Sequence, residues 1–187
     1  GVKFDRDSGA AGFHLHQEGG HSRRRIYHAG DHTGHDIQAA LLEGASREKN
    51  IQFFTFSNAI DLITAPDTAG RGTKVQGAYV VQPDGAVEVF LADKVMVATG
   101  GAGKVYLYTS NPDVASGDGI AMCYRAGAAV ANMEFFQFHP TCLYHPQAKS
   151  FLITEAMRGE GAHLRRIGGE EFMHNYHPQR ELAPRDI

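Results

Sequence analysis

Four polar side chains in short apolar or glycine-rich stretches have the chemistry needed to bind a dicarboxylate. They are Glu18 in QEGGHS, His139 in QFHPT, Thr154 in FLITEAMRGEG and Arg185 in APRDI. Arginine binds a carboxylate through two parallel hydrogen bonds, and histidine and threonine can donate to one. Taken singly, each residue fits an ordinary structural role better: a solvated charge, a hydrogen-bonded core histidine, an N-cap and a surface charge near a helix start. Taken together, they favour a small-dicarboxylate site.

The stretch EFFQFHPT, residues 134–141, places a histidine at the end of an aromatic run. Its three phenylalanines predict a buried wall of side chains. Pro140 disfavours helical backbone at His139 and keeps that residue extended. We therefore expect His139 to be held rigidly at the edge of a packed region.

A second candidate site begins at VMVATGGAG, residues 95–103. A buried strand over 95–98 that ends in Thr99, Gly100 and Gly101 would let the backbone approach a ligand, at the end of the sheet where α/β folds bind cofactors. A tight turn explains these glycines equally well. The chain contains no GxGxxG loop, so residues outside it would have to complete a dinucleotide site.

Asp118 lies between two glycines in SGDGIAM. A carboxylate at a helix N-terminus stabilises the helix by about 0.3–1 kcal/mol, which is the simpler interpretation. The flanking glycines also leave room for a ligand to approach.

The composition excludes several classes of protein. With 18 basic and 21 acidic residues among 187, the net charge of −3 gives no electrostatic support for nucleic-acid binding. No apolar run approaches the roughly 20 residues that span a bilayer, and the first residues lack a signal-peptide pattern. We expect a cytoplasmic protein with no membrane partner, in which Cys123 and Cys142 are reduced.

The eleven histidines raise the question of a metal site. His14 and His16 would share one face of a strand, and His28, His32 and His35 lie close together in the sequence. No cysteine or carboxylate stands at zinc-like spacing from them, so we expect no metal. A metal-binding module or a non-catalytic structural piece is the alternative from a different functional class.

The order of the expected elements predicts an α/β (α+β) fold that carries a β-meander. The irregular pattern beyond Met133 suggests a domain boundary, with one domain over 1–132 and another over 133–187. Residues 1–20 are expected to form short strands around a glycine-rich turn, followed by a helix over 34–48 with Thr33 as its N-cap. A strand is expected over 51–63, then two strands around the turn Pro83-Asp84-Gly85. The buried strand 95–98 and a helix over 117–128 complete the expected elements.

The two ends of the sequence indicate an internal piece of a longer protein. The first residues, GVKFDRDSG, read as part of a hairpin, and Pro184 near the other end reads as the first turn of a helix. We therefore expect further chain on both sides.

The motifs ATGG, SGDGIAM, MEFFQFHPT, TEAMRGEG, FM and LAPRDI, in this order, resemble the flavoprotein family of succinate dehydrogenase, fumarate reductase and L-aspartate oxidase. The resemblance covers essentially the whole chain. Within the family, the stretches EGGHSRRRIYHAGDHTG, NPDVASGDGIAM and YHPQAKSFLITEAMRGEG are most similar to the L-aspartate oxidases.

This resemblance implies an enzyme that oxidises L-aspartate to iminoaspartate with non-covalent FAD. Oxygen or fumarate would reoxidise the flavin, the imine would feed quinolinate and NAD biosynthesis, and quinolinate synthase is a candidate partner. The alternative is a fumarate reductase or succinate dehydrogenase flavoprotein subunit. Residues 1–132 would be the later part of a Rossmann-like FAD-binding domain, and 133–187 part of a capping domain that closes over the substrate. The phosphate loop would lie outside, so the isolated chain is expected to be inactive and to hold FAD weakly or not at all.

The resemblance also implies roles for individual residues. His139 and Thr154 would bind a substrate carboxylate, and Arg185 would transfer a proton and stabilise developing charge. Glu18 would face the ammonium group that aspartate has and succinate lacks. The residues expected at FAD are Asn58, Ala59, Thr99, Gly100, Gly101 and Asp118.

Overall fold

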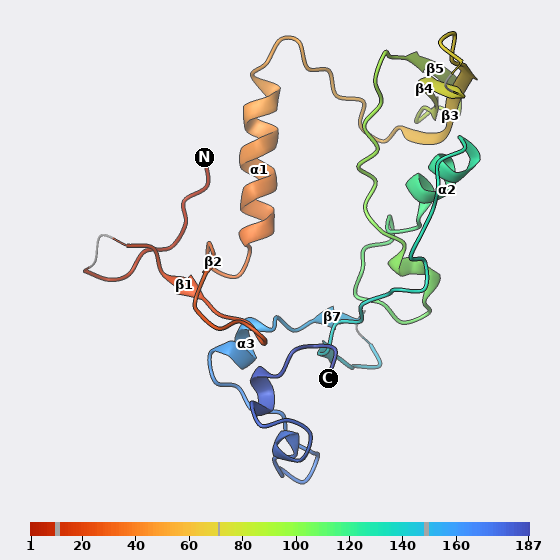
Figure 1. Cartoon of the computed structure of the whole chain (residues 1–187). Coiled ribbons are helices and arrows are strands. Elements are labelled where there is room, and N and C mark those ends of the chain that lie inside the picture. Colours follow the sequence, from red (N-terminus) through yellow and green to blue (C-terminus); the bar gives the residue numbers. More distant parts are fainter. Residues whose placement is uncertain (10–11, 71, 148–149) are drawn as a thin grey trace. The chain divides into compact units, whose positions relative to one another are not determined.

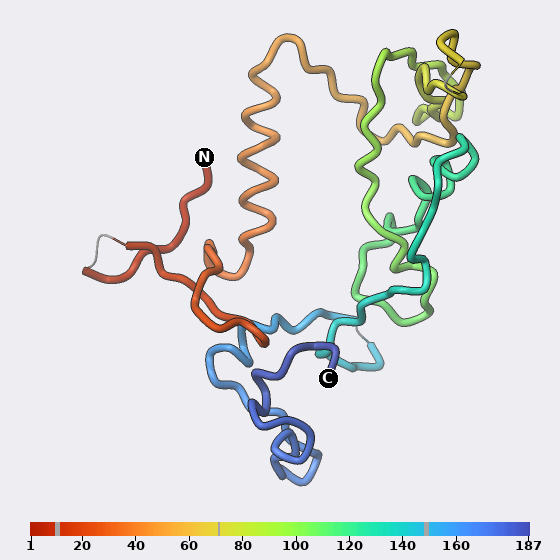
Figure 2. Tube along the Cα trace, in the orientation of Figure 1, coloured from red at the N-terminus to blue at the C-terminus, as the bar shows by residue number. Residues whose placement is uncertain are grey.

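A computed structural model describes residues 1–9, 12–70, 72–147 and 150–187. Figure 2 traces the chain from the N-terminus to the C-terminus. Its residues divide into two compact units. The first consists of Gly1–Gln52, Gln137–Tyr144 and Phe151–Ile187, and the second of Phe53–Phe136 and His145–Ser150. The expected domain boundary between residues 132 and 133 stays a prediction.

The first unit opens with a short antiparallel ribbon (Figure 1). Strand β1 (Leu15–His16) pairs with β2 (Ile26–Tyr27), with Leu15 opposite Tyr27 and His16 opposite Ile26. The expected glycine-rich turn includes residues 10 and 11, which lie outside the described residues. An isolated bridge joins Arg6 to Phe13 across that turn.

Helix α1 (Thr33–Ser46) follows the ribbon and confirms the helix predicted over 34–48. The prediction of Thr33 as its N-cap is wrong, because the N-cap is His32 and Thr33 already lies within the helix. The Thr33 hydroxyl instead accepts the backbone N–H of Ala29 at 3.0 Å. This bond ties the preceding turn to the start of the helix.

The rest of the first unit is made of short elements. Strands β6 (Cys142–Leu143) and β7 (Phe151–Leu152) pair antiparallel, and helix α3 (Ala156–Gly159) follows. Two 3₁₀ turns come next, η2 (Met173–Asn175) and η3 (Arg180–Leu182). Where a helix was expected to start, the structure has one turn, closed by the N–H of Ile187 on the carbonyl of Pro184 at 3.2 Å.

The second unit contains the predicted meander. Strands β3 (Asn58–Pro66), β4 (Thr73–Val81) and β5 (Val87–Leu91) form an antiparallel sheet in that order. The turn between β4 and β5 is closed by the Gln82 N–H on the Ala86 carbonyl, and Gly85 takes a left-handed φ of 87° that suits glycine. The meander and the mixed α/β class are confirmed. The strand expected over 51–63 begins only at Asn58.

The short turn η1 (Gly103–Val105) and helix α2 (Asp118–Arg125) complete the second unit. Helix α2 confirms the helix predicted over 117–128. The buried strand predicted over 95–98 is wrong, because these residues are not in a strand and Met96 is 91% exposed. A strand requires a hydrogen-bonded neighbour, and no strand among the described residues pairs with this segment.

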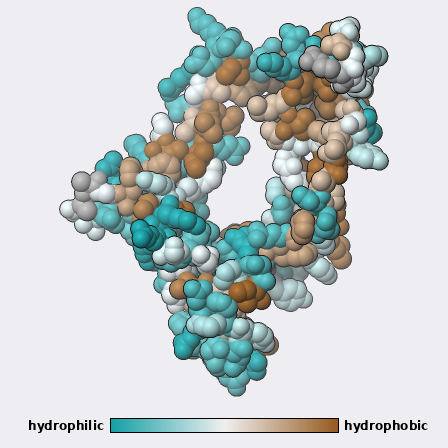
Figure 3. Space-filling view, viewed as in Figure 1, coloured by the Kyte–Doolittle hydropathy of each residue, from teal (hydrophilic) through white to brown (hydrophobic). Residues whose placement is uncertain are grey.

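Large apolar side chains remain at the surface (Figure 3). Among the described residues, the buried apolar ones are four, and three of them are alanines: Ala29, Ala115, Met122 and Ala183. Phe135 is 77% exposed and Phe138 60%, so the predicted burial of the aromatic run is wrong for this chain, whose own packing does not cover it. Among the described residues, no helix combines the length and apolar character required to cross a membrane.

Candidate functional site

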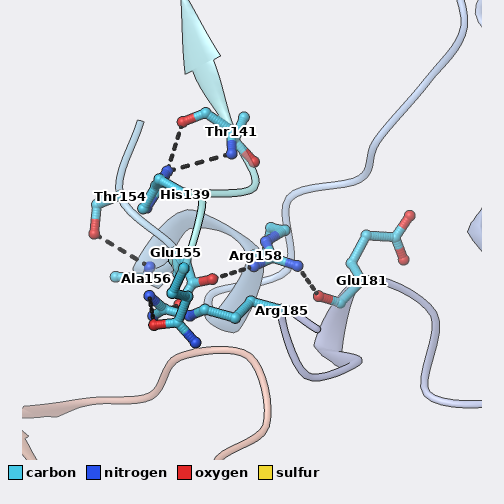
Figure 4. Close-up of polar contacts among 9 residues, drawn as sticks. His139, Thr141, Thr154, Glu155, Ala156, Arg158, Glu181 and Arg185 are labelled. Carbon is cyan, nitrogen blue, oxygen red and sulfur yellow. Dashed lines mark hydrogen bonds and ion pairs between the residues drawn. The ribbon is translucent and has the colours of Figure 1, made fainter. Parts of the chain in front are cut away.

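The carboxylate of Glu155, at the start of α3, lies between two guanidinium groups (Figure 4). Its Oε1 accepts from Arg158 Nη2 at 2.8 Å, and its Oε2 accepts from Arg185 Nη2 at 2.5 Å. Glu155 is 4% exposed and Arg158 is 8% exposed. A buried carboxylate requires such partners because its desolvation is costly. Glu155 therefore fixes the position of Arg185.

Each arginine of this trio has a second contact. Arg158 Nη1 donates to the carbonyl of Glu181 at 3.0 Å, which anchors it to η3. Arg185 Nη1 donates to Gln137 Oε1 at 3.3 Å, and the Arg185 side chain is about one-third exposed. Arg185 is thus held from one side while part of its guanidinium stays accessible to a ligand.

His139 is oriented by the hairpin of β6 and β7. Its Nδ1 lies 2.8 Å from the carbonyl oxygen of Thr141 and 3.3 Å from the Thr141 nitrogen. The same carbonyl accepts the N–H of Ile153, which joins the two strands beyond their ladder. The shorter contact favours a proton on Nδ1, so Nε2 can donate to a substrate carboxylate only when the ring is protonated.

Thr154 lies between β7 and α3. Its Oγ1 accepts the backbone N–H of Ala156 at 3.3 Å, which satisfies one of the unpaired donors at the start of the helix. A hydroxyl group can accept and donate at once. The structural role and the predicted carboxylate contact are therefore compatible in one residue.

The loop that carries Glu18 packs against the same elements. A Cβ added to Gly159 would overlap the carbonyl oxygen of Gln17, so the backbones approach more closely than any other residue allows. The N–H of Gly20 donates to the carbonyl of Leu182 at 2.9 Å. Glu18 itself is half-buried.

The structure thus gathers the segments of all four predicted substrate residues in the first unit. Sequence reasoning missed two residues there, Glu155 and Arg158. Their signal was present in TEAMRGEG, where an acid and a base three positions apart face each other on one turn of helix. We assigned a role only to Thr154 in that motif.

A further contact joins the stretch HSRRR to RGEG. Arg24 reaches Glu160 with both terminal nitrogens, Nη2 lying 2.7 Å from Oε2. This hydrogen bond, more than the accompanying charge attraction, lowers the pKa of the Glu160 carboxyl below its usual value. Arg24 also donates to the carbonyl of Leu15 at 3.1 Å, which links β1 to the end of α3.

In the second unit, three of the predicted cofactor residues line one cavity of about 170 Å³ between β3 and α2. These are Asn58, Ala59 and Asp118. Asp118 is the first residue of α2, so the helix N-terminus and a carboxylate face the same space. Arg125, at the other end of α2, also lines the cavity, and its Nε donates to Asp61 Oδ2 at 3.0 Å.

A second cavity of about 450 Å³ is lined by Thr99 and Gly100 together with Gly119, Ile120 and Cys123 of α2. A Cβ added to Gly119 would overlap Thr99 Oγ1, so only glycine allows this approach. The lining carries no charged side chain, whereas the first cavity does. A polar and an apolar cavity lined by the same helix fit parts of a cofactor with a polar and an aromatic portion. Gly101 is exposed and does not line this cavity.

Comparison with known proteins identifies the family. A family model described as "FAD binding domain" matches residues 1–187. The chain belongs to the FAD binding domain family. The predictions of this flavoprotein family and of FAD as its cofactor are confirmed.

Similar members of the FAD binding domain family include curated L-aspartate oxidases. The chain is 55% identical to one from Yersinia pestis over 192 residues, which cover all of this chain and 36% of the relative. It is 44% identical to one from Synechocystis, covering 32% of that protein. The chain therefore spans about a third of the length of these relatives.

Solved structures support the fold. The chain matches a mutant of E. coli quinol fumarate reductase (FrdA) with a TM-score of 0.84 and 30% identity, over 98% of this chain and 32% of that one. This similarity confirms the fold class predicted from the sequence.

Proposed function

We propose that the chain is part of a longer flavoenzyme that oxidises L-aspartate to iminoaspartate. The relatives from Yersinia pestis and Vibrio cholerae, both named L-aspartate oxidase, are 55% identical to it, whereas the matched fumarate reductase is 30% identical. This difference supports aspartate over succinate as the substrate. A fumarate reductase or succinate dehydrogenase flavoprotein remains the second candidate because the fold is shared.

The observation that carries this proposal is the arrangement around Glu155. Arg185, held by Glu155 and Gln137, presents the free part of its guanidinium for a substrate carboxylate. His139 lies at the hairpin and Thr154 at the start of α3; the Thr154 hydroxyl has a donor left for a carboxylate oxygen, and His139 Nε2 supplies one when the ring is protonated. A rigid set of donors holds a dicarboxylate at low entropic cost.

Glu18 would discriminate between substrates. Aspartate carries an ammonium group that succinate lacks, and a half-buried carboxylate pairs with a cation more strongly than an exposed one does. The close packing of the Gln17–Glu18 backbone on Gly159 fixes the loop that presents this carboxylate. Glu18 would also repel a substrate that places a third carboxylate there.

FAD, bound non-covalently, supplies the hydride acceptor. Asn58, Ala59 and Asp118 would hold a polar part of it, and Thr99, Gly100 and Gly101 would let the backbone approach an apolar part. Residues 1–132 would form part of the FAD domain, and residues 133–187 part of a cap that closes over the substrate. We also propose that oxygen or fumarate accepts the electrons and that the product is used to form quinolinate. Quinolinate synthase would be a partner, and the enzyme would be cytoplasmic.

Turnover in air tests this function. The longer enzyme, supplied with FAD, is expected to convert L-aspartate to an imine that hydrolyses to oxaloacetate and ammonium, while oxygen is reduced. Succinate under the same conditions is the comparison substrate. Turnover of succinate without turnover of aspartate would select the second candidate.

A further inference from the structure

Three imidazoles lie close together at the β1–β2 ribbon, and none of them is assigned to substrate or FAD. They belong to His14, His16 and His28, and one ring nitrogen of each lies within 4.8 Å of the others. The pairing of β1 with β2 accounts for the proximity of these three side chains. His16 is in β1 and His14 lies just before that strand, on the other side of Leu15, and the register that pairs Leu15 with Tyr27, continued by one residue, brings His14 opposite His28.

The surroundings of its two ring nitrogens suit His28 to bind a metal ion. Its Nε2 lies 2.8 Å from Nδ1 of His14, while its Nδ1 lies 3.2 Å from the carboxylate of Asp5. Asp5 is itself fixed, since its Oδ2 accepts the N–H of Gly30 at 3.0 Å. A carboxylate behind one nitrogen of a histidine, with the other nitrogen facing the ion, is the usual support of a metal-binding imidazole.

One nitrogen of the buried His28 ring, the Nδ1 that faces Asp5, is poorly satisfied. His28 is 7% exposed, and its buried Nδ1 makes no well-aligned hydrogen bond despite the nearby Asp5. Buried imidazole nitrogens require partners. A cation on Nε2 would polarise the ring and strengthen the contact between Nδ1–H and Asp5.

We propose that His14, His16 and His28 form a binding site for a divalent transition metal ion of the zinc type. Imidazole suits Zn²⁺, which takes four ligands at about 2.0–2.1 Å, so the fourth position would go to water. The rings of His16 and His28 are stacked, with centroids 3.5 Å apart and planes at 13°, so one ion cannot lie in the plane of both rings as they stand. His16 must therefore turn about its side-chain bonds to face the ion, and the site closes as metal binds.

This site was not expected from the sequence, which offered no zinc-like ligand spacing. The ligands come from the two strands of a ribbon, and their proximity depends on the register, which spacing does not reveal. A second group, His32, His35 and Asp36, also lies close together, but its histidines are exposed and both contact Asp36. In the binding test, this second group is the alternative metal site from which the first must be distinguished.

The test is binding of Co²⁺ and Zn²⁺ to the protein that carries this chain, without a histidine tag. We expect one Co²⁺ per chain with the intense visible absorption of a four-coordinate site, displaced by Zn²⁺. Asp5→Ala should weaken Zn²⁺ binding by about 10- to 100-fold, as loss of a supporting carboxylate does elsewhere. His28→Ala should abolish stoichiometric binding.

Matched variants keep the test decisive. Because His28 is buried, His14→Gln on a half-buried residue provides a second ligand removal if His28→Ala fails to fold, with circular dichroism as the check. His174→Ala removes an exposed imidazole elsewhere and should leave binding unchanged. Absence of Co²⁺ binding to the folded protein, or binding lost with His35→Ala but kept with His14→Gln, would overturn the proposal.

Discussion

Arg185 and Arg158 share one buried carboxylate, with Arg185 Nη2 2.5 Å from Glu155 Oε2 and Arg158 Nη2 2.8 Å from Oε1. A substrate arginine that had to be held by substrate alone would lose rotamer entropy at every binding event. If Arg185 binds the substrate as proposed, its contact with Glu155 lowers that cost in advance. The arrangement also keeps two cations close together that would otherwise repel each other.

Glu155→Gln should therefore destabilise the first unit. The amide keeps the shape but leaves Arg158 buried without a counter-charge, which costs about 3–5 kcal/mol where one partner of a buried pair is removed. Denaturant unfolding measures the effect. Glu170→Gln is the matched control, because its carboxylate faces Arg166 at 3.9 Å on the surface, and its loss should cost less than about 1 kcal/mol.

Arg185→Lys should impair catalysis while the protein stays folded. Lysine keeps the charge but has no planar fork with which to contact Glu155, Gln137 and a substrate carboxylate together. We expect kcat/KM for aspartate to fall by about 100-fold, equivalent to about 2.7 kcal/mol. Steady-state kinetics measure this change. A variant as active as the parent would show that Arg185 does not take part in substrate binding or catalysis.

Glu18→Gln tests the basis of substrate choice. The neutral amide no longer attracts the ammonium of aspartate, so aspartate oxidation should fall more than fumarate reduction. Both rates are measured on one preparation, and Glu48→Gln at an exposed position after α1 should leave their ratio unchanged. Equal losses in the two reactions would show that Glu18 has no role in selectivity.

Gly159→Ala probes the contact between the Glu18 loop and α3. The added methyl group would overlap the Gln17 carbonyl, so the backbone must shift, at a cost of about 1–3 kcal/mol. Thermal unfolding reports the cost, and aspartate kinetics report displacement of Glu18. Gly168→Ala is the control, since its methyl group would meet open space and should change stability by less than about 0.5 kcal/mol.

The ion pair of Asp61 and Arg125 should make stability depend on pH. The Arg125 hydrogen bond, followed by the Leu62 N–H, lowers the pKa of Asp61. A carboxyl group whose pKa is lower in the folded state stabilises the fold above its unfolded pKa of about 3.9, and this contribution is lost as the pH falls through the folded value.

The unfolding midpoint should accordingly differ between the parent and Asp61→Asn near about pH 6, and the difference should shrink below about pH 3. Arg125→Gln should reproduce the effect, because it removes the other partner. A difference that stays constant across this range would show that the ion pair contributes nothing.

The sequence predicted the elements that depend on local signals. Pro83-Asp84-Gly85 supplied the turn of the meander, and the apolar period from Ile37 supplied α1. It failed where the outcome depends on partners distant in the chain. The segment over 95–98 has the composition of a central strand but no paired neighbour among the described residues, and Phe135 and Phe138 are apolar without being covered.

The residues of the candidate site, too, were predictable from the sequence only in part. The roles predicted for His139, Thr154 and Arg185 come from their motifs and stay predictions. The role of Glu155 was missed because its two arginine partners lie three and thirty positions away, and only the folded chain shows that they converge. The histidine cluster was missed for the same reason, since strand register brings it together.

If the proposed function is correct, L-aspartate reduces the FAD of the enzyme to which this chain belongs. The most direct measurement is anaerobic titration of the longer, FAD-loaded enzyme, following the flavin absorbance. We predict that L-aspartate bleaches the flavin and that succinate does so poorly. Rapid bleaching by succinate with none by L-aspartate would contradict the account.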